Sequence, residues 1–218
     1  MKKFIFLFVL IITISSNAFS QLGFFSLGYI LPLGGSLPSY YIGNQKNIYK
    51  SQSAFEVGLL LQPTYNFILG KNVILGLGMD LGYQRDSYRF IDNIDGQKYT
   101  HVFDSLNIGG YFETMFARMF MVGLGGGVKV PLGGSYRYDY IIEVLNYSRL
   151  KSRFDTIVIP YIKFLVGMKT FVSFSGISLS FYVNYDFPVM KYKRTSVQFS
   201  SVDLGVQIGL YFSNLSYE

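Results

Sequence analysis

Large apolar residues alternate with small or polar residues over most of the stretch from Ala54 to Gln84. Successive side chains of a β-strand point to opposite faces, so a period of two gives one apolar face and one small or polar face. Two such runs flank the short segment Gly70-Lys71-Asn72, which predicts a β-hairpin. The apolar members are Phe55, Val57, Leu59, Leu61, Tyr65, Phe67 and Leu69, followed by Val73, Leu75, Leu77, Met79, Leu81 and Tyr83.

The same pattern predicts six further strands, so the chain is expected to be all-β with eight strands. Approximate spans of the six are 22–33, 101–116, 119–131, 155–170, 176–188 and 197–212. The span 155–170 is the least regular, because Pro160 has no backbone hydrogen to donate within a sheet.

The expected connections alternate in length. Residues 70–72, 117–118 and about 170–175 form tight turns, whereas 34–52, 85–100, 132–154 and 189–196 are long and polar. Strands that run alternately up and down bring all the tight turns to one end and all the long loops to the other. That arrangement is typical of outer-membrane β-barrels, with short periplasmic turns and long external loops. Ten strands are an alternative, since residues 136–154 could add a hairpin.

The residues between the apolar ones favour lipid rather than water around the predicted barrel. They are mainly Gly, Ser, Asn and Gln with a few charges, which suits a narrow interior better than a solvated surface. A tilted spanning strand needs only about 9–11 residues, and ring closure leaves no unpaired edge in lipid. Aromatic girdles at the two membrane interfaces are expected to contain Tyr83, Tyr111, Tyr185 and Phe212. A secreted soluble barrel or sandwich is the alternative.

The first twenty residues read as an export signal. Lys2 and Lys3 precede an unbroken apolar run over 4–14, and a short polar stretch ends with Ser20. Small residues at positions 18 and 20 fit cleavage between Ser20 and Gln21. We therefore expect a signal peptide over 1–20 and one barrel domain over 21–218.

The pattern as a whole resembles the small OmpA/OmpX-type bacterial outer-membrane barrels, over nearly the whole mature chain. The final strand is similar to the signal that such barrels present to their assembly machinery: Asp203, Gly205, Ile208, Leu210 and Phe212. The resemblance implies a closed antiparallel transmembrane barrel in the bacterial outer membrane, with membrane lipids and that machinery as partners. One departure is that residues 213–218 continue beyond the terminal aromatic.

Several charged residues fall on the inward phase of the predicted strands. They are Glu56, Asp80, Glu113, Lys129, Lys163, Lys169, Asp186 and Asp203. Opposite charges are expected to pair there, because a lone buried charge is very unfavourable. Eight strands leave an interior just wide enough for side chains, which favours a salt-bridged plug over a gated polar path. No cofactor or metal is expected.

The predicted long loops are basic and rich in tyrosine. The basic residues are Lys191, Lys193 and Arg194 in the last loop, and Arg149, Lys151 and Arg153 in the third. Tyrosines interleaved with them include Tyr40, Tyr49, Tyr136 and Tyr192. Such a rim suits anionic lipid headgroups, an external polyanion or a surface protein, with an ordinary solvated rim as the alternative. Nucleic acid is not an expected partner of an exported membrane protein.

The sequence offers one candidate group for an enzyme site. The single histidine, His101, stands near Asp104 and Ser105, but residues four apart on a strand are roughly 13 Å apart. A surface-loop histidine is therefore expected rather than a catalytic one. The sequence favours a non-enzymatic structural or surface-interaction barrel, with narrow porin-like uptake as the alternative and an envelope-lipid enzyme third.

Overall fold

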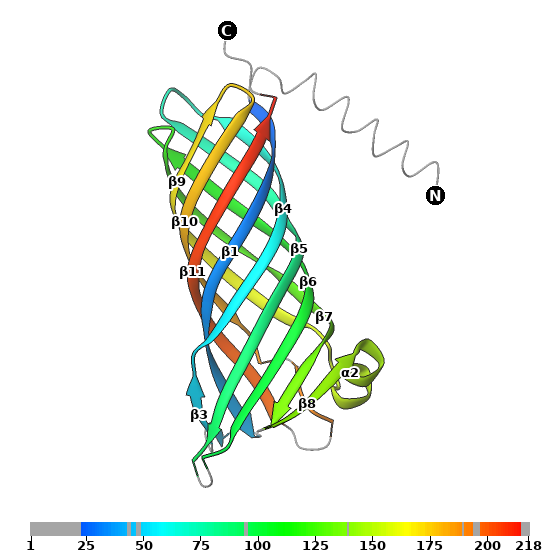
Figure 1. The fold of residues 1–218 in the computed structure, drawn as a ribbon. Coiled ribbons are helices and arrows are strands. Elements are labelled where there is room, and N and C mark those ends of the chain that lie inside the picture. The colour runs from blue at the N-terminus through cyan, green and yellow to red at the C-terminus, as the bar shows by residue number, and fades with distance from the viewer. Residues whose placement is uncertain are drawn as a thin grey trace, which may run out of the picture.

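In a computed structural model, the chain forms one elongated β-barrel (Figure 1). The structure describes residues 23–42, 45–46, 49–93, 96–138, 140–188, 190–193 and 197–214. The predicted cleavage site at Ser20 and Gln21 lies outside these residues, as does Arg194. Eight long strands form the wall: β1 (Gly23–Ile42), β4 (Ala54–Ile68), β5 (Val73–Asp92), β6 (Lys98–Phe116), β7 (Phe120–Tyr138), β9 (Ile159–Val172), β10 (Ser175–Asp186) and β11 (Val197–Ser213).

The eight strands close into a ring. Each pairs antiparallel with the next, and β11 pairs with β1 from Ser26↔Ser213 to Ile42↔Val197. Closure gives each wall strand a partner on both sides, which satisfies the backbone hydrogen bonds that lipid cannot. The predicted eight-stranded antiparallel barrel is therefore confirmed.

Shorter elements gather at the end opposite the tight turns (Figure 1). They are β2 (Gln45–Lys46), β3 (Tyr49–Gln52), β8 (Ile141–Asn146) and the helix α2 (Tyr147–Arg153). The hairpin considered as a source of two extra strands is present only in part, since β8 pairs with β7 and stays outside the ring. No helix among the described residues combines the length and apolarity that crossing a membrane requires.

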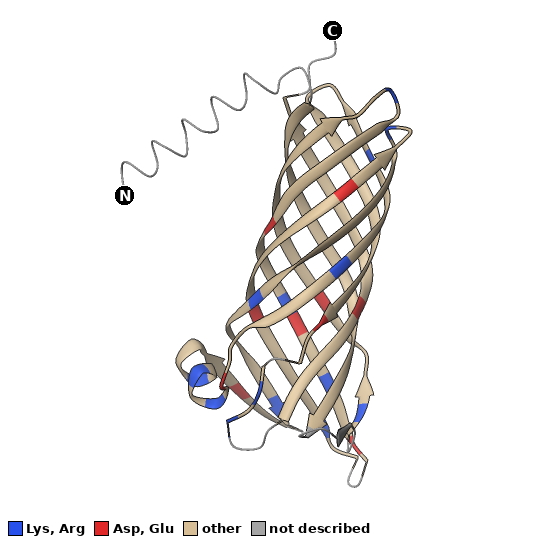
Figure 2. Cartoon of the chain, turned by 180° about the vertical axis from the view of Figure 1, so that it is seen from behind, with Lys and Arg blue, Asp and Glu red and all other residues tan. Residues whose placement is uncertain are grey.

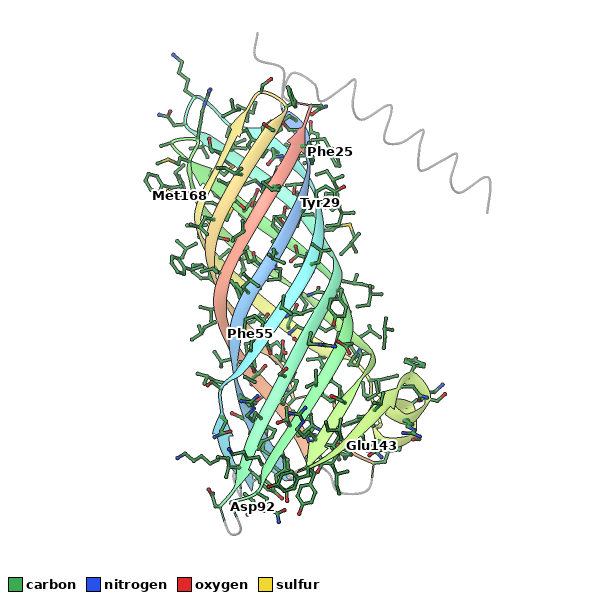
Figure 3. All side chains as sticks on the ribbon, viewed as in Figure 1. Phe25, Tyr29, Phe55, Asp92, Glu143 and Met168 are labelled. Carbon is green, nitrogen blue, oxygen red and sulfur yellow. The ribbon has the colours of Figure 1, made fainter. Side chains whose placement is uncertain are left out.

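The wall has an apolar outer face and a polar inner face. On β4, Phe55 is 65% exposed while its neighbour Glu56 is 1% exposed. Phe25, Tyr29 and Met168 point away from the barrel (Figure 3). An apolar outside around a polar inside is the reverse of a water-soluble barrel and the arrangement of a transmembrane one.

Four strands, β1, β5, β6 and β7, extend beyond their predicted spans at the loop end, and the first three long loops are correspondingly shorter. β5 has 20 residues, whereas about 9–11 suffice to cross a bilayer. The apolar outer face ends near Arg85 and Asp104, which form an outward-facing salt bridge with Nε and Oδ1 2.7 Å apart. The barrel wall beyond this pair therefore extends out of the membrane towards the loop end.

Two prolines, Pro32 and Pro131, lie within strands β1 and β7. Pro32 fills a gap in the β1–β4 register, between Ile30↔Leu60 and Leu33↔Val57. Pro131 lies at the irregularity between β6 and β7 beside Ser105. Both positions lose a ladder hydrogen bond where the pairing is already interrupted, which is where a sheet tolerates proline. Tyr111, expected in an aromatic girdle, instead points into the lumen and is buried.

The effect of an arginine substitution on stability distinguishes the lipid-facing wall from the part of the surface that lies in water. We expect Leu124→Arg on β7 to lower the free energy of unfolding in lipid vesicles by roughly 2–4 kcal/mol. The control Val144→Arg changes an apolar residue of similar exposure on β8, outside the ring, and should alter stability by no more than about 0.5 kcal/mol. Urea titrations followed by heat-modifiable gel migration measure both. Equal effects would contradict the assigned membrane band.

Candidate functional site

The lumen is filled by charged side chains that pair across it. The structure places all the predicted lumen residues inside the barrel and buried. Near the tight-turn end, Lys169 Nζ lies 2.5 Å from Glu113 Oε1, and further along Lys163 pairs with Asp80. Figure 2 shows most charged residues towards the loop end of the barrel.

The third ion-pair group is centred on Lys129. Its Nζ lies 2.6 Å from Asp86 Oδ1, 2.9 Å from Asp186 Oδ2 and 3.6 Å from Asp203 Oδ2. Asp86 was not among the predicted lumen residues, because residues 85–100 were expected to form a loop. In the structure β5 continues to Asp92, so the inward phase that contains Asp80 also brings Asp86 inside.

Uncharged polar side chains bridge these groups. The Tyr161 hydroxyl donates to Asn107 Oδ1, and Asn107 Nδ2 donates to Gln84 Oε1, each at 2.8 Å. Gln62 Nε2 donates to Asp80 Oδ1 at 2.6 Å, and Gln62 Oε1 accepts from the Tyr211 hydroxyl. The cavity found between these layers has only about 10 Å³, room for about one water molecule.

Apolar clusters close both ends of this polar interior. Towards the tight turns, the buried residues include Phe24, Ile74, Met115, Met121 and Phe171. At the loop end they are Tyr88, Phe90, Phe103, Leu145, Leu150, Phe154, Ile159, Met190, Val197 and Phe199. In the part of the chain that the structure describes, the lumen is therefore a packed plug.

A larger cavity of about 330 Å³ lies above the plug at the loop end. We call it the aromatic cup; its lining residues are Tyr40, Tyr49, Phe90, Tyr99, His101, Tyr136, Arg153, Tyr192 and Val197. Its walls are held by edge-to-face ring contacts, such as Tyr40–Tyr49 with centroids 4.5 Å apart. Four of these residues, Tyr40, Tyr49, Tyr136 and Tyr192, were predicted as loop tyrosines, but no feature of the sequence indicates that they converge.

The cup wall is tied together across separate segments of the chain. Arg153 Nη2 lies 2.5 Å from Glu143 Oε1 on β8, while the Arg153 carbonyl accepts from the backbone N–H of Lys193 at 2.9 Å. Lys193 Nζ donates to the Lys151 carbonyl at 2.8 Å. Arg149 and Lys151 are exposed on α2, so the described members of the two predicted basic groups lie around one mouth.

His101 was expected to be a surface-loop residue, but the structure places it in the aromatic cup. β6 begins at Lys98, which turns the His101 ring inward, where it lies 4.7 Å from the Tyr136 ring and 4.8 Å from the Phe199 ring. His101 stands beyond the membrane band, on the loop side of Asp104. Burial and, to a smaller extent, the positive charge of Arg153 together lower the pKa of its imidazole to about 3.

The three residues weighed as an enzyme site do not assemble into one. Asp104 faces outward and binds Arg85, whereas the Ser105 hydroxyl donates to Asp86 Oδ2 at 3.4 Å. His101 Nδ1 lies 3.4 Å from the Tyr192 hydroxyl. Nucleophilic catalysis needs the base within hydrogen-bond reach of the nucleophile, and these contacts direct the three side chains to different partners.

No protein-family profile and no curated protein sequence matches this chain. Among solved structures it is similar to the outer membrane protein OprG from Pseudomonas aeruginosa, at 12% identity over 88% of this chain and 95% of that one, with a TM-score of 0.41. It is similar to the outer membrane protease OmpT from Escherichia coli, at 10% identity over 88% and 96%, with a TM-score of 0.43. It is also similar to Ail of Yersinia pestis, at 11% identity over 84% of this chain and 98% of that one, with a TM-score of 0.34. The architecture expected from OmpA/OmpX-type barrels is present in the eight-stranded ring of this chain.

The protonation state of the cup can be read from the single histidine of the chain. We expect the His101 imidazole to stay neutral from pH 8 down to about pH 4, because its pKa lies far below the ordinary value of about 6.5. The ¹³C chemical shifts of the selectively labelled ring in detergent micelles measure this directly. The urea-unfolded protein is the control, and its ring should titrate near pH 6.5. A folded-state midpoint above about pH 6 would contradict burial of the ring.

Proposed function

We propose that the chain is a non-enzymatic outer-membrane barrel that binds an external anionic partner at its loop end and does not conduct solutes. One observation supports this above the others. The packed plug fills the lumen, while a cavity of about 330 Å³ with a guanidinium in its wall lies at the mouth. A site of this size is at the lower end of small-molecule pockets.

The proposed location follows from the surface chemistry of the wall. A closed barrel with an apolar band needs lipid around it, and bacterial outer membranes hold barrels of this kind. In such barrels the tight turns face the periplasm and the longer connections face outward. We infer the same orientation here, so the aromatic cup and its basic surroundings face the exterior.

The chemistry of the mouth suggests the class of partner. Tyrosine rings present flat faces and hydroxyl groups, which suit stacking against a planar group or a sugar ring. Arg153 adds a planar donor array that suits sulfate, phosphate or carboxylate. Lys191 and Lys193 extend the positive charge beyond the cup, which suits a ligand with several anionic groups. A sulfated or phosphorylated oligosaccharide combines these features.

A porin-like role predicts ion flow, and the plug predicts none. We expect the purified, folded protein to give no discrete conductance steps in planar bilayers, since side chains fill the lumen and the cavity between its polar layers holds about one water. Folded protein is verified beforehand by heat-modifiable gel migration. Reproducible single-channel steps from folded protein, absent from heat-denatured samples of the same preparation, would overturn the non-conducting assignment.

Binding at the mouth is tested with a sulfated oligosaccharide as the probe. We expect the double variant Lys191→Gln/Lys193→Gln to weaken binding roughly five-fold at low salt, because each exposed charge contributes modestly. Arg153→Gln, inside the cup, should weaken binding by roughly ten-fold or more. Isothermal titration calorimetry in detergent measures the dissociation constant of the probe for the unmodified protein, the double variant and Arg153→Gln.

The control for this experiment carries the same charge change at the other end of the barrel. Lys71 and Arg118 lie in the tight turns, where Arg118 Nε donates to the Lys71 carbonyl at 2.9 Å. The variant Lys71→Gln/Arg118→Gln should bind the probe as the unmodified protein does. Equal weakening in the two double variants would mean that net charge, and not the mouth, attracts the probe.

A further inference from the structure

The Lys129 group has more negative charge than it has partners for. Three buried carboxylates, those of Asp86, Asp186 and Asp203, lie within 4.0 Å of one ammonium group. A fourth, that of Glu56, is also buried and has an oxygen within 4.8 Å of oxygens of Asp86 and Asp203. Among the described residues, Lys129 is the single cation within 4.0 Å of any of these carboxylates. Buried charges without compensation are strongly unfavourable, so this layer calls for more positive charge than the chain provides.

The four carboxylates differ in how well their oxygens are satisfied. Asp186 accepts from the Tyr88 hydroxyl, Ser201 Oγ and Asn184 Nδ2 as well as from Lys129. Glu56 Oε2 and Asp203 Oδ1, in contrast, are buried with no hydrogen-bond partner. The excess charge is therefore concentrated on the side of the lumen where Glu56 and Asp203 lie.

A third unpartnered oxygen belongs to the same place. Ser36 Oγ on β1 has no hydrogen-bond partner, and Ser36 is fully buried. In the sheet register Ser36 stands directly opposite Asp203 on β11, and on its other side opposite Ala54 on β4, two residues from Glu56. Residues two apart on a strand share a face, so all three side chains enter the lumen from adjoining strands.

The spacing of the carboxylate oxygens fits a calcium ion. Glu56, Asp86 and Asp203 each offer an oxygen, and these oxygens all lie within 4.8 Å of one another. Ca²⁺ binds oxygen at about 2.3–2.6 Å, so ligands on opposite sides stand up to about 5 Å apart. Mg²⁺ binds at about 2.0–2.1 Å and demands a tighter octahedron. An all-oxygen set with excess negative charge is what hard divalent cations select.

We propose that Glu56, Asp86, Asp203 and Ser36 bind one Ca²⁺ ion inside the barrel, beside the Lys129 ammonium. The four side chains supply at least four oxygens, and bidentate binding by Glu56 and Asp203 would raise this to six, the lower end of what Ca²⁺ takes. The ion would offset most of the uncompensated charge and satisfy three oxygens that otherwise have no partner. This site is separate from the aromatic cup and does not rest on the proposed external ligand.

The position of the site determines how the ion is acquired. Tyr88, Phe103 and Phe199 belong to the buried apolar cluster that covers this layer from the loop end. The ion is therefore taken up while the barrel folds, and it exchanges slowly afterwards. Ser36 and Asp203 also belong to β1 and β11, the two strands whose pairing closes the ring, so the bound ion would hold the closing strands together.

The test refolds urea-unfolded protein into a non-ionic detergent free of lipopolysaccharide, with either CaCl₂ or a chelator present. After gel filtration in chelator, atomic emission should find one calcium per chain in the first sample, and its unfolding temperature should be several degrees higher. Metal-free protein after refolding in CaCl₂, with the same unfolding temperature as the chelator sample, would overturn the proposal. Protonated carboxylates would then account for the unpartnered oxygens.

Variants locate the ion. Glu56→Gln and Asp203→Asn should abolish calcium retention, and Ser36→Ala, a mild change, should weaken calcium affinity roughly ten-fold. The matched control is Glu113→Gln, which removes an equally buried lumen carboxylate from the Lys169 pair and should retain calcium. Two results would show that the assigned site is wrong. One is that Ser36→Ala retains calcium as fully as the unmodified protein and the Glu113→Gln control do. The other is that Glu113→Gln loses calcium as the site variants do.

Discussion

The hydrogen bonds of the backbone are the constraint on which the rest of this structure depends. Lipid offers no donors or acceptors, so a sheet in a membrane must close on itself. Here β11 returns to pair with β1 along seventeen residue pairs, and the ring keeps eight strands. Closure at this number fixes the bore, and the bore in turn decides that the interior must be filled by side chains.

A narrow, filled interior makes charge pairing obligatory along the whole barrel. Lys169 with Glu113 and Lys163 with Asp80 form one-to-one pairs, and polar side chains such as Asn107 join the layers. The Lys129 layer departs from this rule, since three carboxylates share one ammonium group and the buried Glu56 carboxylate lies beside two of them. Three oxygens of this layer, Glu56 Oε2, Asp203 Oδ1 and Ser36 Oγ, are buried without a hydrogen-bond partner, which makes the layer a natural place to look for a missing binding partner.

Alternation in the sequence was enough to predict the ring, its two faces and the inward position of Glu56, Asp80 and Asp203. It was not enough to predict where the strands end, because Tyr, Ser and Arg replace the apolar residues once the wall leaves the membrane. Asp86 and His101 were missed for this reason. On β5 the inward phase continues through Asp86 and Tyr88, although the outward positions Arg85 and Ser87 are no longer apolar. Convergence of the cup residues depends on strand stagger, which periodicity alone does not encode.

The extra strand length accounts for both candidate sites. Beyond Arg85 and Asp104 the wall has left the membrane, and there its inner face holds the rings and the neutral histidine that form the aromatic cup.

At the same level β4 gives way to β3 with a one-residue change of register against β5, from Val57↔Arg85 to Gln52↔Arg89. The freed backbone N–H of Ser87 points to Glu56 Oε1 at 3.4 Å. The carboxylate that caps this irregularity is thereby held in the lumen beside Asp203 and Ser36, across the seam between the first and last strands. Pairing of these strands joins the most distant parts of the chain and is the slowest kind of contact to form. An ion that binds only after the seam has closed would stabilise the ring at its latest step.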